Sequence, residues 1–108
     1  MFVIFEVGGE SYKLRLNTRA IVLLERQLGC NPLTIFGDGE TIPTITAMVS
    51  ILHASLQQYQ HSISLNDAYD IFDKYLADGK TTVDFIPVIF EIYKTSGLIP
   101  KEGNEKNA

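Results

Sequence analysis

The side chains best suited to catalysis or metal binding are few, and their spacing matches neither task. His53 and His61 stand eight residues apart, with no cysteine or second carboxylate at the spacing of a metal site. Cys30, the one cysteine, would need a histidine and an orienting group beside it to act as a nucleophile. It follows a predicted helix end, where the dipole disfavours a thiolate, so we interpret it as a packing residue. The pattern predicts no enzyme activity, no cofactor and no metal site.

A calcium-binding loop between two predicted helices is excluded by its register. Residues 73–85 place Gly79 between two helical patterns, as an EF-hand loop would. With Gly79 at the sharp turn, the first and last ligand positions fall on Lys74 and Phe85, which supply no carboxylate. A helix–glycine–helix corner explains the segment better. A solvated helix face is likewise the expected place for the acidic series Asp67, Asp70 and Asp73.

Composition and charge exclude other classes of partner. The chain has 108 residues, with 9 Lys and Arg against 13 Asp and Glu and a net charge of −4. This balance argues against nucleic-acid binding, and no apolar run reaches the roughly 20 residues of a membrane span. A single cysteine fits a reducing compartment. We expect a single helical domain with an N-terminal hairpin over residues 1–99, and a disordered polar tail over residues 100–108.

The charge is unevenly distributed along the chain. Residues 13–26 hold four basic side chains against one acidic, whereas residues 27–91 hold eight acidic against two basic. This layout is typical of solvated helix faces, but it would also let the protein steer a partner or associate with a second copy of itself.

Hydrophobic periodicity predicts a hairpin followed only by helices. Residues 2–7 and 11–16 have the pattern of strands, and the glycines between them can adopt the positive φ angles of a tight turn. Cap and breaker residues then bound the helical segments: Asn17 or Thr18 to Leu28, Pro32 to Phe36, Pro43 to about Tyr59, Ser64 to Ala77, and Thr81 or Thr82 to Gly97. The expected fold class is mainly α (α+β), an N-terminal β-hairpin followed by a compact bundle of about four helices.

Two of these segments, 43–59 and 82–97, have more apolar residues than one buried stripe requires. Such a surplus belongs either to a crowded core or to a surface that binds a partner. We predict a binding or assembly protein whose anchors follow helical spacing, as in helix-in-groove contacts. The candidate partner-binding residues, each with core packing as its alternative, are Met48, Ile51, Leu52, Phe85, Ile89 and Tyr93.

Several short motifs in combination resemble the tail assembly chaperones of long-tailed phages and prophages. They are the hairpin ending in YKLRL (12–16), the runs NTRAI (17–21) and LERQLG (24–29), the run NPL (31–33), and a late helix ending in SGLI (96–99). The resemblance covers roughly residues 3–99, in the order of elements as well as in motif.

The resemblance implies a non-enzymatic role in the cytoplasm of a host bacterium. Such chaperones bind the long, aggregation-prone tape measure protein, help to recruit tail tube subunits, and are not expected in the mature virion. The alternative is a ring-forming head–tail connector or another structural tail component, whose signature would be stable oligomers and presence in purified particles.

In the same family a programmed frameshift near the end of the gene appends a second domain, which engages the tail tube protein. Glu105-Lys106-Asn107 can be encoded GAA-AAA-AAC, which contains the slippery heptamer A-AAA-AAC in the required frame. The resemblance thus implies that this chain is the shorter, unshifted product, with residues 100–108 as the linker to the appended domain.

Overall fold

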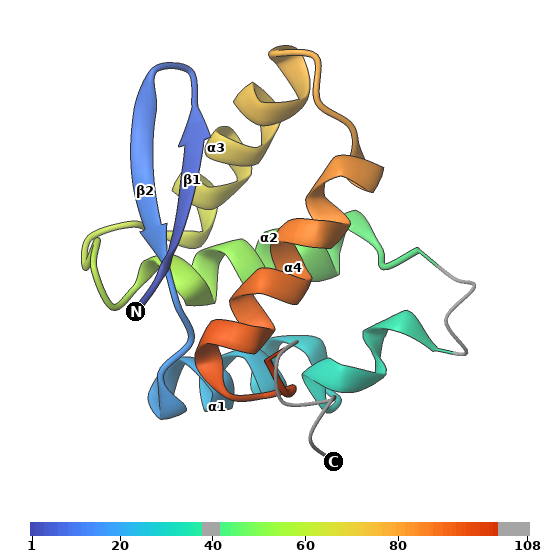
Figure 1. Cartoon of the computed structure of the whole chain (residues 1–108). Coiled ribbons are helices and arrows are strands. Elements are labelled where there is room, and N and C mark those ends of the chain that lie inside the picture. Colours follow the sequence, from blue (N-terminus) through green and yellow to red (C-terminus); the bar gives the residue numbers. More distant parts are fainter. Residues whose placement is uncertain (38–41, 102–108) are drawn as a thin grey trace.

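A computed structural model of the protein describes residues 1–37 and 42–101. It confirms the predicted fold class: a two-stranded hairpin is followed by four α-helices and one short 3-10 helix (Figure 1). The predicted polar tail lies, from residue 102 onward, outside the described residues.

The hairpin consists of β1 (Val3–Val7) and β2 (Glu10–Leu14), paired antiparallel with Val7 opposite Glu10. Gly8 and Gly9 form the two-residue turn with φ angles of 57° and 82°, which the primed turns require and a Cβ disfavours. The Gly8 N–H also donates to Asp78 Oδ2 (3.0 Å), a bond that ties the turn to a residue 70 positions away. The hairpin is therefore fixed by its own turn chemistry and by a tertiary contact.

A side-chain amide covers the outer edge of β2. The Lys13 N–H donates to Gln60 Oε1 (2.9 Å), and Gln60 Nε2 donates to the Lys13 carbonyl (2.9 Å). The Gln60 amide thus supplies the donor and the acceptor that a neighbouring strand would offer.

Side-chain caps begin α1 (Thr18–Leu28) and η1 (Pro32–Phe36), whose bounds agree with the sequence prediction; the cap of α1 was predicted and that of η1 was not. The Asn17 side chain accepts from the Ala20 N–H, and α1 ends at Gly29 in the left-handed conformation with φ 71°. Asn31 is the N-cap of η1, and its side chain accepts from the Leu33 N–H (2.9 Å).

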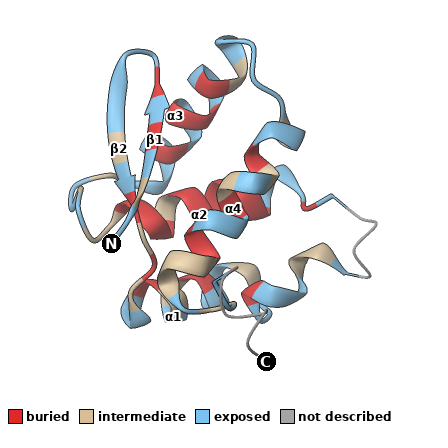
Figure 2. Ribbon diagram, viewed as in Figure 1, coloured by how far each residue is buried: buried red, intermediate tan, exposed pale blue. Residues whose placement is uncertain are grey.

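The central helix is α2 (Ile45–Leu56), which contacts α1, α3, α4 and β2. Nine of its residues are buried, and Figure 2 shows most of its ribbon in the colour of buried residues. Its predicted bounds were too wide. Thr44 is the N-cap and accepts from the Ala47 N–H (3.1 Å), so Pro43 precedes the cap instead of opening the first turn. The apolar residues around α2 are explained by this central position.

Capping boxes open α3 (Leu65–Ala77) and α4 (Thr82–Ser96). In the first, the side chains of Ser64 and Asp67 each accept a hydrogen bond from the other residue's backbone N–H, as predicted. In the second, Thr81 and Asp84 form the same pair of bonds, which was not predicted. The signal for the second box was present as Thr-Thr-Val-Asp, the same spacing as Ser-Leu-Asn-Asp.

We expect the two capping boxes to make stability depend on pH. Backbone and side-chain hydrogen bonds from Ser64 and Thr81 lower the pKa values of Asp67 and Asp84 respectively. A carboxyl whose pKa is depressed by folding stabilises the fold above its unfolded pKa of about 4, and this contribution is lost as pH falls through the folded value.

The measurement is urea unfolding of the wild type and of Asp67→Asn/Asp84→Asn between pH 7 and about pH 3. The gap between their midpoints should narrow as pH falls below about 4. A gap that is constant over the whole range would contradict the assignment.

An aromatic cluster joins the hairpin to α3 and α4. Phe5 lies 5.1 Å from Tyr75 and 5.7 Å from Phe85 between ring centroids, and Phe72 lies 5.2 Å from Phe85 at 88°. Tilted and edge-to-face pairs of this kind add to the stability gained from burying the rings. The cluster belongs to one hydrophobic core that contains residues of both strands and all four α-helices.

Candidate partner-binding surface

The predicted partner-binding residues lie in the core. Those on α2 are buried because helices and the hairpin surround α2, and those on α4 lie on the face that packs inward. In this fold they have no surface to offer a partner, so core packing, the alternative that the sequence left open, accounts for them. The exposed fraction is 0% for Met48, Ile51, Leu52, Phe85 and Ile89, and 1% for Tyr93.

The outward face of α4 is apolar as well. Val83 is 57% exposed, Phe90 is 39% exposed, and Pro87 between them is exposed too. Residues spaced by four and then three lie on one side of a helix, so these side chains form a single stripe, called here the α4 ridge. Pro87 also removes a helical N–H, which leaves the Val83 carbonyl without its usual donor.

An open groove of about 560 Å³ lies along the α4 ridge. Pro87 and Phe90 line it together with Ile86, Ile99 and Pro100, so its wall is mainly apolar. Phe36 of η1 stacks on Phe90, with ring centroids 4.8 Å apart and an interplanar angle of 10°. This stacking extends the apolar surface from α4 onto η1.

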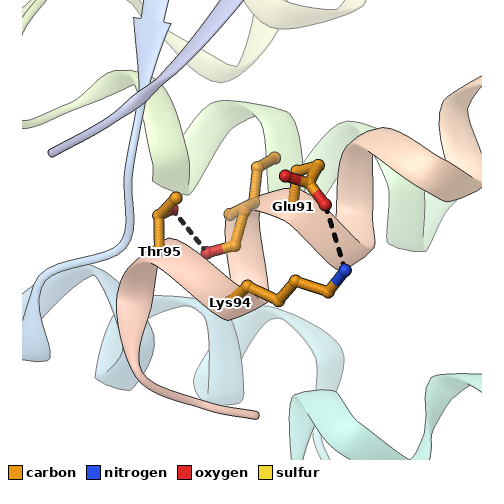
Figure 3. A network of polar contacts seen from close by, with 4 residues as sticks. Glu91, Lys94 and Thr95 are labelled. Carbon is orange, nitrogen blue, oxygen red and sulfur yellow. Dashed lines mark hydrogen bonds and ion pairs between the residues drawn. The ribbon is translucent and has the colours of Figure 1, made fainter. Parts of the chain in front are cut away.

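One end of the groove is polar. Lys94 Nζ and Glu91 Oε2 form an ion pair of 3.2 Å, one turn apart on α4, and both line the groove (Figure 3). The Thr95 hydroxyl beside them donates to the Ile92 carbonyl (3.1 Å). A ligand in the groove would therefore meet apolar side chains over most of its length and charged ones at one end.

Tyr93, one of the predicted contacts, supports this surface from beneath. Its hydroxyl donates to the Pro32 carbonyl (2.9 Å), a buried bond between residues 61 positions apart, and burial raises the pKa of the phenol. The bond holds η1 against α4, and η1 carries Phe36 to its stacked position on Phe90. Tyr93 is thus a positioning residue for the exposed aromatic pair.

The residues with catalytic or ligand potential do not converge. His53 Nδ1 lies 3.4 Å from Gln27 Nε2, burial lowers the pKa of His53, and His61 is exposed elsewhere. Cys30 is exposed, so its interpretation as a packing residue was wrong; the turn after α1 leaves its side chain at the surface. Across residues 1–37 and 42–101, no group of three or more His, Cys, Asp or Glu is placed to hold a metal ion.

The α4 ridge was only partly visible in the sequence. The predicted contacts on α4, Phe85, Ile89 and Tyr93, belong to the apolar stripe that is buried. Val83, Pro87 and Phe90 form a second apolar stripe on the opposite side, and their spacing was the available signal.

Comparisons with known proteins identify the chain by family alone. No helix in the described part of the chain is both long and apolar enough to cross a membrane. No curated protein and no solved structure matches the chain. One family profile matches residues 3–108, nearly the whole sequence. The chain belongs to that family, a family of unknown function designated DUF6096.

Proposed function

We propose that the protein is a non-enzymatic tail assembly chaperone of a phage or prophage, which covers an apolar helical stretch of the tape measure protein. The observation that carries the proposal is the apolar outward face of α4 with its groove, combined with the sequence motifs of such chaperones. The binding surface would be the α4 ridge, together with Phe36 and Ile86.

The chemistry of the groove supports a helix as its ligand. An amphipathic helix docks by placing apolar side chains, spaced three or four apart, against a complementary apolar surface. The α4 ridge offers that spacing, and the stacked Phe36–Phe90 pair adds a large aromatic surface at its C-terminal end. The Glu91–Lys94 pair at one end can orient the bound helix through its polar residues.

The motifs behind the resemblance have structural roles in this chain. Asn17 begins α1, Gly29 ends it, and Asn31 begins η1. Each role alone is a general capping function that many proteins share. Their support for the chaperone proposal lies in their combination with a hairpin followed by helices alone.

A chaperone of this kind would act in the host cytoplasm and be absent from mature particles, whereas a ring-forming connector would be retained in them. The tail tube protein would be engaged mainly through a longer, frameshifted form. The nucleotide sequence around codons 105–107 tests the frameshift, since it either contains A-AAA-AAC followed by an overlapping frame or does not. Sequencing further downstream would locate the partner gene, which the proposal expects to be a very long reading frame that encodes a helical protein.

The test is co-expression of the protein with that long helical protein. The wild type should keep the partner soluble and co-purify with it, because covered apolar helices do not aggregate. Phe90→Asp places a charge at the stacked aromatic pair of the α4 ridge and should lower recovery of the complex at least about tenfold.

Ile45→Asp is the matched control, because Ile45 is 50% exposed at the start of α2 and receives the same charge. It should leave recovery unchanged. Equal recovery with both variants would contradict binding through the α4 ridge. Failure of the wild type to bind the partner would contradict the chaperone proposal itself.

A further inference from the structure

The outward faces of α1 and α3 carry opposite charges around exposed apolar side chains. On α1, the exposed Arg19 and Arg26 flank Val22, which is 39% exposed. On α3, the exposed Asp70 and Asp73 lie beside Tyr69, which is 43% exposed. These two surfaces, called here the basic face and the acidic face, differ from the α4 ridge, whose three residues Val83, Pro87 and Phe90 are apolar and whose neighbouring charges Glu91 and Lys94 pair with each other.

These charges are not neutralised within the described part of the molecule. Within residues 1–37 and 42–101, the side chains of Arg19, Arg26, Asp70 and Asp73 take part in no hydrogen bond or ion pair. Each face therefore presents charge that a partner of opposite sign can use.

The two faces point to opposite ends of the molecule. Both α1 and α3 pack on α2, which lies between them, and Figure 1 shows α1 at the bottom of the view and α3 at the top. The residues named on the two faces are exposed, whereas the core side of α1 and α3 is formed by others, among them Leu24 and Phe72. One copy cannot bring its own two faces together, but two copies can.

The basic face is hollowed. A shallow groove of about 380 Å³ is lined by Thr18, Arg19, Val22, Leu23 and Arg26. Its apolar floor suits an aromatic ring, and guanidinium groups on both sides can stack on that ring as well as pair with carboxylates. Tyr69 with Asp70 and Asp73 presents this combination of ring and acids on one helix face.

We infer that the protein associates head to tail with a second copy of itself. Tyr69 of one copy occupies the groove of the basic face of the next, and Asp70 and Asp73 meet Arg19 and Arg26. The exposed Glu25 on α1 and Lys74 on α3 leave each face with a net charge of one sign, +1 and −1 respectively over these residues. Because the two faces are different and point apart, the contact is heterologous and leaves one free face at each end of the pair. This inference does not depend on the proposed function, since neither face includes the α4 ridge.

Sedimentation of the full chain tests the inference. The wild type should associate as concentration rises in about 20 mM salt and dissociate in about 500 mM salt, where the screening length falls to a few ångströms. Arg19→Glu/Arg26→Glu and Asp70→Lys/Asp73→Lys should each weaken self-association about a hundredfold, because like charges then meet. Tyr69→Ala should weaken it about tenfold.

The mixture of the two charge-reversed variants is the decisive sample. The first variant retains the acidic face and the second retains the basic face, and the two reversed faces are complementary to each other as well, so equal amounts should associate with one another as the wild type does with itself. The variant carrying all four reversals should regain self-association. Lys80→Glu/Lys101→Glu and Glu6→Lys/Glu10→Lys are controls with equal changes in net charge on other surfaces, and they should associate as the wild type does.

Three results would overturn the inference. The first is a wild type that stays monomeric at low salt up to a protein concentration of about 1 mM, which is the limit of weak binding. The second is that the charge-reversed double variants associate as the wild type does. The third is that the mixture of these two variants stays monomeric. Circular dichroism of each variant shows that it is folded before its sedimentation is interpreted.

Discussion

Replacing Ile51 with aspartate is expected to unfold the protein. Ile51 is 0% exposed on α2, the helix that contacts α1, α3, α4 and β2. The change removes a buried apolar side chain, which costs about 2–5 kcal/mol, and adds a carboxyl that must be buried charged or taken up protonated without a partner. The sum exceeds about 5 kcal/mol, which is comparable with the whole stability of a domain of this size.

Phe90→Asp is the matched comparison, because it introduces the same carboxylate at a position that is 39% exposed. It should unfold cooperatively and lose about 2–3 kcal/mol, since it removes one stacked pair and part of the buried area of one ring at the surface. Far-UV circular dichroism with urea titration distinguishes the two. A folded Ile51→Asp protein with a native midpoint would contradict the burial of α2.

Replacing Phe85 with alanine is expected to destabilise the fold by about 3–5 kcal/mol. Phe85 is 0% exposed, and its ring centroid lies 5.7 Å from Phe5, 5.2 Å from Phe72 and 5.9 Å from Tyr75. Truncation therefore leaves a cavity where the hairpin, α3 and α4 meet, and it removes several edge-to-face contacts at once.

Val83→Ala on the same helix is the control, because Val83 is 57% exposed and should change stability by less than about 0.5 kcal/mol. The measurement is the free energy of unfolding from urea titrations of both variants. A loss below about 1 kcal/mol for Phe85→Ala would show that the aromatic cluster is not a major source of stability.

Most of the fold followed from local signals in the sequence. The Gly8-Gly9 turn, the Asn17 and Ser64 caps and Gly29 were all recognisable, because each satisfies a backbone requirement within a few residues of itself. The start of α2 was misplaced because proline suits the first turn of a helix, whereas Thr44, one residue later, has the side chain that accepts from the Ala47 N–H.

The proposed partner-binding surface could not be located in the same way. Both α2 and α4 are apolar on more than one side, and only the packing of other elements determines which side is covered. For α2 nearly all residues beyond its first turn are buried, and for α4 the stripe with Phe85 and Ile89 faces the core while the stripe with Phe90 faces outward. These arrangements depend on contacts between residues far apart in the chain, which helical periodicity does not encode.

The charges of the two faces could be predicted from the sequence, but the positions of the faces in the fold could not. The basic and acidic stretches were evident from the sequence, but their separation to opposite ends depends on α2 lying between α1 and α3 (Figure 1). Because the two faces lie apart, the inferred contact joins different surfaces of the two copies and does not close into a symmetric dimer.

Hydrogen exchange of the proposed complex with the tape measure protein shows most directly whether the outward face of α4 binds an apolar helix. If it does, binding slows amide exchange in residues 83–94 and in η1 around Phe36, with α1 and α3 little changed. Protection concentrated on α1 or α3, with exchange in α4 unaffected, would contradict binding at this face.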